Sequence, residues 1–285
     1  MKKSKILTLI MVCVMAITSI FSLTGCGQKL AMGKEMVKYK TQFDSIVALD
    51  NDAVDAVVID SIMAGYYAVE GDYAGKIAIV PNVVLAEEEY GIAGRKNDKA
   101  FVSKINEALI ALEGNGTIDN VANTFGVKDS LIIDENTTNP LANADDNSWQ
   151  AIVSSGKIVI GYTIFAPIAY EVEGVLTGFD IELIKKTVEW LNTTYNVDLD
   201  VEFVVIDWNA KEALLNADAI DLIWNGMTIT PERAEAMCIS VPYLANRQVA
   251  VVKTENVGNY TDAASFADAV IGVEKGSAGQ AVVKG

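Results

Sequence analysis

Short apolar runs alternate with segments of helical periodicity along most of the chain. Runs with the length of buried strands lie at residues 55–60, 76–80, 90–93, 157–161, 201–206, 220–224, 249–252 and 270–273. Between them, apolar positions recur three or four residues apart, as at Phe101, Ile105, Leu109 and Leu112, which predicts amphipathic helices. Strands that alternate with helices predict an α/β architecture.

Local signals add detail to this pattern. The stretch that begins at Lys34 is polar and is predicted to start as a helix. Asp180 is a predicted N-cap, and Pro231 occupies an early helical position where its missing N–H costs nothing. Residues 134–147 contain one large apolar side chain, so we expect a linker there.

The N-terminus has the pattern of a targeting segment. Three lysines precede an uncharged run at residues 6–23, which ends in Leu-Thr-Gly-Cys at residues 23–26. A charged start, an apolar middle and small residues are typical of a secretory signal. The last four residues resemble a bacterial lipobox, so we expect residues 1–26 to be a lipoprotein signal peptide and lipobox, with lipidated Cys26 anchoring an extracytoplasmic protein to the cell membrane. An ordinary cleaved signal and a retained helix are the alternatives.

Composition excludes several classes of function. The net charge is −16, whereas nucleic-acid binding needs a basic surface. The chain has no histidine, which excludes histidine-based triads and histidine metal sites, and we expect neither a metal nor a cofactor. Beyond Cys13 and Cys26, Cys238 stands alone, and a small buried apolar residue is its expected role.

Three motifs carry a resemblance to a known family. They are Gly-Phe-Asp-Ile at 178–181, Ile-Trp-Asn-Gly-Met-Thr-Ile-Thr-Pro-Glu-Arg at 223–233 and Asn-Arg-Gln-Val at 246–249. With them the chain resembles the polar amino-acid branch of the type II solute-binding proteins. The resemblance implies a two-lobed periplasmic-binding-protein-like fold, in which each lobe is a central sheet flanked by helices. It also implies the substrate-binding component of an ABC importer, with a free amino acid and a membrane permease as partners.

The order of the halves differs from that family. The part that resembles residues 150–285 comes first in the family, and the part that resembles residues 34–133 comes second. We therefore expect a circular permutant, with lobe one at residues 91–253, including the linker, and lobe two split between residues 27–90 and 254–285. Two passages near 89–92 and 252–255 would form the hinge. A truncated piece of a tandem binding protein and a strand-exchanged dimer are the alternatives to a permuted monomer.

The chemistry of a free amino acid identifies candidate ligand residues. Its carboxylate needs donors, which Arg233 and Thr228, the backbone at Gly226, and the helix start at Ser277 and Ala278 can supply. By resemblance, Asp60 accepts from the ammonium, and Phe165 and Trp208 clamp the side chain. The alternatives are a solvated Arg233, an Asp60 that caps a helix, and aromatic rings that only pack in the core.

The residues around Phe165 also bear on specificity. Relatives that bind cationic amino acids often carry an acid just before this position, whereas residues 162–165 read Tyr-Thr-Ile-Phe. We therefore expect a neutral or polar amino acid. No histidine and no obvious nucleophile accompany the predicted site, so catalysis is not expected. A sensory module without transport and a dehydratase-like enzyme on the same fold are the competing functions.

Overall fold

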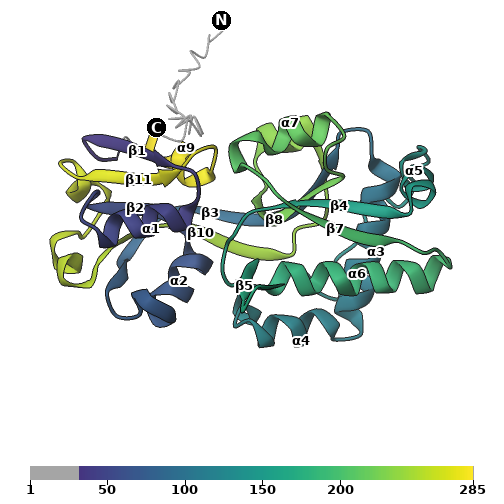
Figure 1. Cartoon of the computed structure of the whole chain (residues 1–285), viewed down its shortest axis with the longest axis horizontal. Helices are drawn as coiled ribbons and strands as arrows, with labels where there is room; N and C mark the ends of the chain where they lie inside the picture. Colours follow the sequence, from purple (N-terminus) through teal and green to yellow (C-terminus); the bar gives the residue numbers. More distant parts are fainter. Residues whose placement is uncertain (1–31, 285) are drawn as a thin grey trace, which may run out of the picture.

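The computed structural model describes residues 32–284 and confirms the expected α/β architecture (Figure 1). The strands of its main sheet are β1 (Glu35–Tyr39), β2 (Ala56–Asp60), β3 (Ile77–Arg95), β4 (Lys157–Tyr162), β7 (Asp200–Val205), β8 (Leu222–Thr228), β9 (Met237–Ile239), β10 (Leu244–Lys253) and β11 (Val270–Glu274). A separate hairpin pairs β5 (Tyr170–Val172) with β6 (Val175–Thr177). The helices are α1 (Gln42–Asp50), α2 (Ser61–Val69), α3 (Lys99–Gly114), α4 (Thr117–Thr124), α5 (Ser148–Ser155), α6 (Phe179–Tyr195), α7 (Lys211–Asn216), α8 (Pro231–Ala236) and α9 (Ala278–Lys284).

The elements gather in two groups (Figure 1). The β2 group contains β1, β2, β11, α1, α2 and α9, and the β8 group contains β4, β7, β8 and helices α3 to α7. The strand order β1-β11-β2-β10-β3-β8-β4-β7 makes one continuous mixed sheet, in which β10 and β3 lie between the two groups. Elements from both ends of the described chain meet in the β2 group, because β1 runs parallel to β11 and the Met32 N–H donates to the Val283 carbonyl at 3.4 Å.

Two paired strands connect the groups. Residues 244–248 of β10 pair with residues 86–90 of β3, and β3 then pairs with β8 at residues 90–93. Residues 248–251 of β10 pair with β2 and so already lie beside the β2 group. The pairing thus places the passage of β10 between the groups earlier in the chain than the expected 252–255. The runs at 76–80 and 90–93 were expected to be separate strands, but both belong to the single 19-residue strand β3.

Two local predictions were wrong and one was confirmed. The stretch after Lys34 forms the edge strand β1 rather than a helix, because its backbone pairs in register with β11 and an edge tolerates polar side chains. Asp180 is not the N-cap of α6; Gly178 occupies that position. Residues 134–147 form neither helix nor strand, as expected for a linker.

One hydrophobic cluster spans both groups. It joins Ile46 and Leu49 of α1 to Phe101 and Ile105 of α3 and to Phe179 of α6, all of which are buried. Burying this apolar surface is the main term that stabilises such a fold. Cys238 is buried in β9, as predicted, and burial raises the pKa of its thiol to about 11.

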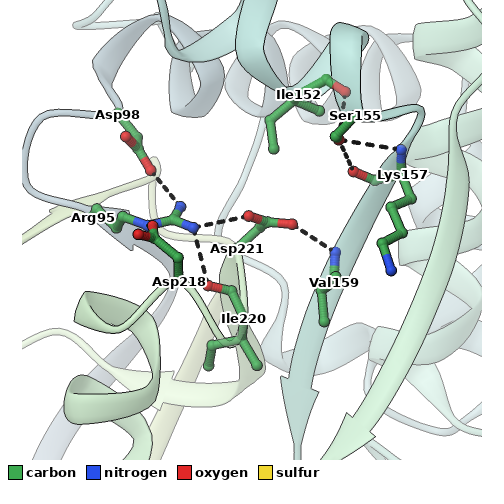
Figure 2. A network of polar contacts seen from close by, with 9 residues as sticks. All are labelled: Arg95, Asp98, Ile152, Ser155, Lys157, Val159, Asp218, Ile220 and Asp221. Carbon is green, nitrogen blue, oxygen red and sulfur yellow. Dashed lines mark hydrogen bonds and ion pairs between the residues drawn. The ribbon is translucent and has the colours of Figure 1, made fainter.

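A polar network fixes the end of β3 to the rest of the β8 group (Figure 2). Arg95 lies within 2.5–2.9 Å of the carboxylates of Asp98, Asp218 and Asp221. The second oxygen of Asp221 accepts from the Val159 N–H of β4 at 2.9 Å. One guanidinium therefore connects β3, the start of β8 and β4, away from the cavity described next.

Candidate ligand-binding site

All eight ligand residues predicted from the sequence line one cavity, with an empty volume of about 360 Å³ including the space open to solvent. The lining comes from both groups: Asp60 ends β2, whereas Thr228 ends β8. A residue from one group therefore faces residues from the other across this space.

Arg233 is buried on the first turn of α8 and is not a solvated helix arginine. Its Nη1 donates to the Thr228 carbonyl at 2.7 Å, and its Nη2 donates to the Gly276 carbonyl at 3.4 Å. In the part of the chain that the structure describes, no ion pair joins Arg233 to a carboxylate. Burial lowers the pKa of this guanidinium. A buried cation with only neutral partners is costly, and an anion in the cavity would relieve that cost.

Asp60 stands at the N-cap position of α2, but its side chain does not cap that helix. Its carboxylate instead accepts from four neutral donors: the Tyr90 hydroxyl at 2.6 Å, Gln248 Nε2 at 3.0 Å, and the side-chain amides of Gln42 and Asn246. Burial, followed by the charge of Glu88, raises the pKa of Asp60. An ammonium ion beside this carboxylate would favour its ionised form.

Gly226 is held in a conformation that other residues rarely adopt. Its φ is +56°, and a β-carbon there would lie 2.5 Å from a ring carbon of Phe165. The Gly226 N–H donates to Asp180 Oδ2 at 2.9 Å, and the Tyr243 hydroxyl contacts both oxygens of that carboxylate at 3.0 Å. Asp180 therefore positions a residue of the cavity wall from behind, a role that the sequence did not indicate.

The remaining predicted residues are also placed at the cavity. Phe165 and Trp208 are both buried, and Phe165 meets the Tyr90 ring edge-on at a centroid distance of 6.4 Å. The Thr228 hydroxyl donates to Glu88 at 3.1 Å. The Ser277 hydroxyl donates to the Glu274 carbonyl at 2.8 Å and accepts from the Gln280 N–H at 3.1 Å, so it is already engaged by its own turn. Ala278 begins α9 next to it.

The structure adds cavity residues that the sequence interpretation missed: Gln42, Met63, Thr163, Ile164, Asn225 and Glu274. Lys211 lies beside the cavity, where its Nζ donates to the Trp208 carbonyl at 3.2 Å and the Gly276 carbonyl at 3.3 Å and sits 4.7 Å from the centre of the Trp208 ring. Burial, followed by the charge of Arg233, lowers the pKa of Lys211 to about 8. The available signal for Glu274 was its position directly after the apolar run at 270–273, where a strand end can present a carboxylate.

Two α/β groups joined by two strands, with a polar cavity between them, fit the class of solute-binding proteins. Residues 158–279 match the model of the bacterial extracellular solute-binding proteins, family 3. Over these residues the match confirms the resemblance to type II solute-binding proteins that the motifs indicate.

Named relatives agree with this class. A probable amino-acid ABC transporter-binding protein of Haemophilus influenzae is 37% identical over 32% of this chain and 34% of its own length. The L-cystine-binding protein TcyJ of Escherichia coli is 25% identical over 47% of this chain and 49% of its own. The crystal structure of an ABC uptake transporter substrate-binding protein from Streptococcus pneumoniae, with bound histidine, is 35% identical over 33% of this chain and 36% of its own, with a TM-score of 0.27. The chain thus spans a third to a half of the length of these curated relatives.

The predicted signal peptide and the lipidation site Cys26 lie outside the described residues. Among residues 32–284, no helix is both long enough and apolar enough to cross a membrane.

Proposed function

We propose that this protein captures a free amino acid between its two groups and delivers it to an ABC importer. The observation that carries the proposal is the buried guanidinium of Arg233, which forms no ion pair with a carboxylate among residues 32–284 and lines the same cavity as the buried carboxylate of Asp60. A zwitterion supplies the missing charge to each: its carboxylate would pair with Arg233 and its ammonium with Asp60. The names of the matched relatives support the same class of ligand.

Several finer points belong to this proposal. The β2 and β8 groups would be the two lobes, and the ligand would draw them together because it contacts both. The pairing of β1 with β11 supports a permuted order that assembles within one chain, as a monomer rather than an exchanged dimer. Lipidated Cys26 would hold the protein at the outer face of the cell membrane, beside the permease.

We propose binding rather than catalysis. A reaction would need a positioned acid or base that acts on the ligand. Asp60 already accepts from four donors, and Arg233 and Lys211 donate to backbone carbonyls, so these three groups hold the ligand or the wall rather than act on the ligand. A neutral or polar amino acid is the favoured ligand, since Tyr162 to Phe165 supply no carboxylate to the wall.

Thermal unfolding against the twenty amino acids tests the proposal, because a ligand that binds only the native state raises the melting temperature. We expect an upward shift with one or a few amino acids. Arg233→Ala should abolish the shift, whereas Arg247→Ala, at an arginine whose side chain is 59% exposed, should keep it.

Three outcomes are informative. An unshifted wild-type transition would refute the ligand class. A shift that survives in Arg233→Ala would remove Arg233 from the site. Product formed from a bound amino acid, detected by mass spectrometry, would favour a dehydratase-like enzyme instead.

A further inference from the structure

Glu274 is a buried carboxyl that the proposed zwitterion contacts do not use. It ends β11, is 4% exposed and lines the cavity. Within the described residues, no ion pair joins it to a lysine or arginine. Burial first, and then the charge of Asp60, raises the pKa of Glu274 to about 8, with Lys211 and Gln42 opposing that shift. A buried acid without an ion pair is favoured in its protonated form, which both donates and accepts a hydrogen bond.

Asn225 supplies an unsatisfied hydrogen-bond donor to the same cavity. It is 2% exposed, and its Oδ1 accepts from the N–H of Thr163 at 2.9 Å and from its hydroxyl at 2.8 Å. Those bonds fix the orientation of the amide, so that Nδ2 is the free end. Nδ2 has no partner among the described residues. A buried amide donor without a partner is uncommon and costs about 1–3 kcal/mol, so a ligand acceptor at this place would recover stability.

The ligand's own groups can be assigned by elimination. The carboxylate is matched to Arg233 and the ammonium to Asp60, as proposed above. Phe165 and Trp208 supply apolar walls for the side chain. Two polar groups of the lining then remain unassigned: the Glu274 carboxyl, which has no ion pair among the described residues, and Asn225 Nδ2, which has no hydrogen-bond partner among them. A polar group at the end of the ligand's side chain would therefore contact Glu274 and Asn225.

We propose that Glu274 and Asn225 select the ligand's side chain, and that the ligand is an amino acid whose side chain carries an uncharged carboxamide. This inference rests on the proposed function. The carboxamide oxygen accepts from Asn225 Nδ2, and its NH₂ group donates to the Glu274 carboxyl. A site built to hydrogen-bond a polar group rejects an apolar analogue strongly, because the analogue leaves the buried protein groups unpaired.

A cationic side chain fits the cavity less well. Arg233 and Lys211 already place two positive charges at its edge, and the shared Gly276 carbonyl is the partner of both. A third cation would add like-charge repulsion, whereas a carboxamide adds none.

The test measures dissociation constants by calorimetry for glutamine, asparagine, leucine and arginine with four proteins: wild type, Glu274→Gln, Glu274→Leu and Asn225→Asp. A glutamine side chain at position 274 keeps a hydrogen-bond donor and an acceptor. The dissociation constant of Glu274→Gln for the preferred carboxamide should therefore stay within about threefold of the wild-type value. Glu274→Leu should lower the preference for the carboxamide over leucine by at least about tenfold. Asn225→Asp keeps the acceptor for Thr163 but removes the free donor, and should weaken carboxamide binding by a similar factor.

The outcomes separate the two proposals. Wild type whose melting temperature shifts with none of the twenty amino acids, in the thermal test of the proposed function, refutes the proposed function itself. Wild type that binds leucine or arginine more tightly than either carboxamide, or a Glu274→Leu variant with an unchanged preference, refutes this inference and leaves the proposed function standing. If wild type binds arginine tightly and Glu274→Gln loses that binding, Glu274 acts as an ionised partner of a cation, and this inference is also overturned. If one variant fails to fold, the wild-type preference for a carboxamide over leucine and arginine, together with the remaining variants, still tests this inference.

Discussion

Replacing Asp180 by asparagine is expected to change how the stability of the protein depends on pH. Asp180 is fully buried, and burial raises its pKa from 3.8 to about 7, against the opposing hydrogen bonds from Gly226 and Tyr243. Between pH 3.8 and about pH 7, the Asp180 carboxyl is therefore protonated in the folded protein and ionised in the unfolded chain. The contribution of Asp180 to the free energy of unfolding is complete below pH 3.8 and is lost as the pH rises through about 7.

The size of the effect follows from the two pKa values. The contribution of Asp180 falls by about 2.6 kcal/mol between pH 5 and pH 8. Asp180→Asn has no titrating group at this place, so its free energy of unfolding should fall by about 2.6 kcal/mol less than that of wild type over the same interval. With a urea dependence of about 2.5 kcal/mol per molar, the difference between the two unfolding midpoints should change by about 1 M.

Urea unfolding followed by tryptophan fluorescence at pH 5, 6, 7 and 8 measures this difference. Asp60 and Glu274 also have raised pKa values, but they are present in both proteins and cancel in the comparison. Asp268→Asn, at an exposed carboxyl, is the matched control and should run parallel to wild type. Equal losses of stability in wild type and Asp180→Asn between pH 5 and pH 8 would refute the reasoning.

Two further substitutions test the walls of the cavity. Gly226→Ala forces a β-carbon to 2.5 Å from Phe165 and 3.0 Å from Tyr90 at a positive φ, so we expect a loss of about 1–3 kcal/mol in urea unfolding and weaker ligand binding, whereas Gly258→Ala, with open space around it, should change neither. Equal stability of the two alanine variants would count against the strained conformation. Lys211→Met removes a cation whose pKa burial lowers to about 8, so the stability of this variant relative to wild type should decline by about 1.3 kcal/mol between pH 7 and pH 9, as wild-type Lys211 loses its proton in the fold. A pH-independent difference would show that the lysine is not perturbed.

The fold could be predicted from the sequence where pattern and length agree. The runs at 157–161 and 270–273 became the largely buried strands β4 and β11, as apolar runs of that length predict. The run at 201–206 became β7, which lies at the edge of the sheet with its side chains half-buried or exposed. The edge strand β1 could not be predicted, since Glu35 and Lys38 interrupt its short apolar pattern and the reason it is a strand is the partner β11, more than two hundred residues away. For the same reason β3 looked like two strands: its middle, at residues 86–89, is polar and is held by pairing with β10.

Local sequence also predicts one part of the candidate site and not the other. Arg233, Gly226 and Thr228 belong to one contiguous motif, so local sequence was enough to place them together in the cavity. Glu274 comes from a different strand, and its role depends on which side chains face it. No local pattern shows that a carboxyl will be buried without a cation.

The connection by β3 and β10 also determines which relative motions of the two groups cost least. Sliding the groups past one another would break the ladder of hydrogen bonds that joins residues 244–248 to residues 86–90. Twisting or bending the two-stranded ribbon leaves that ladder intact, and such ribbons tolerate large twists. The junction therefore opposes sliding of the two groups and leaves twisting and bending of the ribbon as the less costly relative motions. As long as the pairing holds, the residues that face one another across the cavity keep the same register.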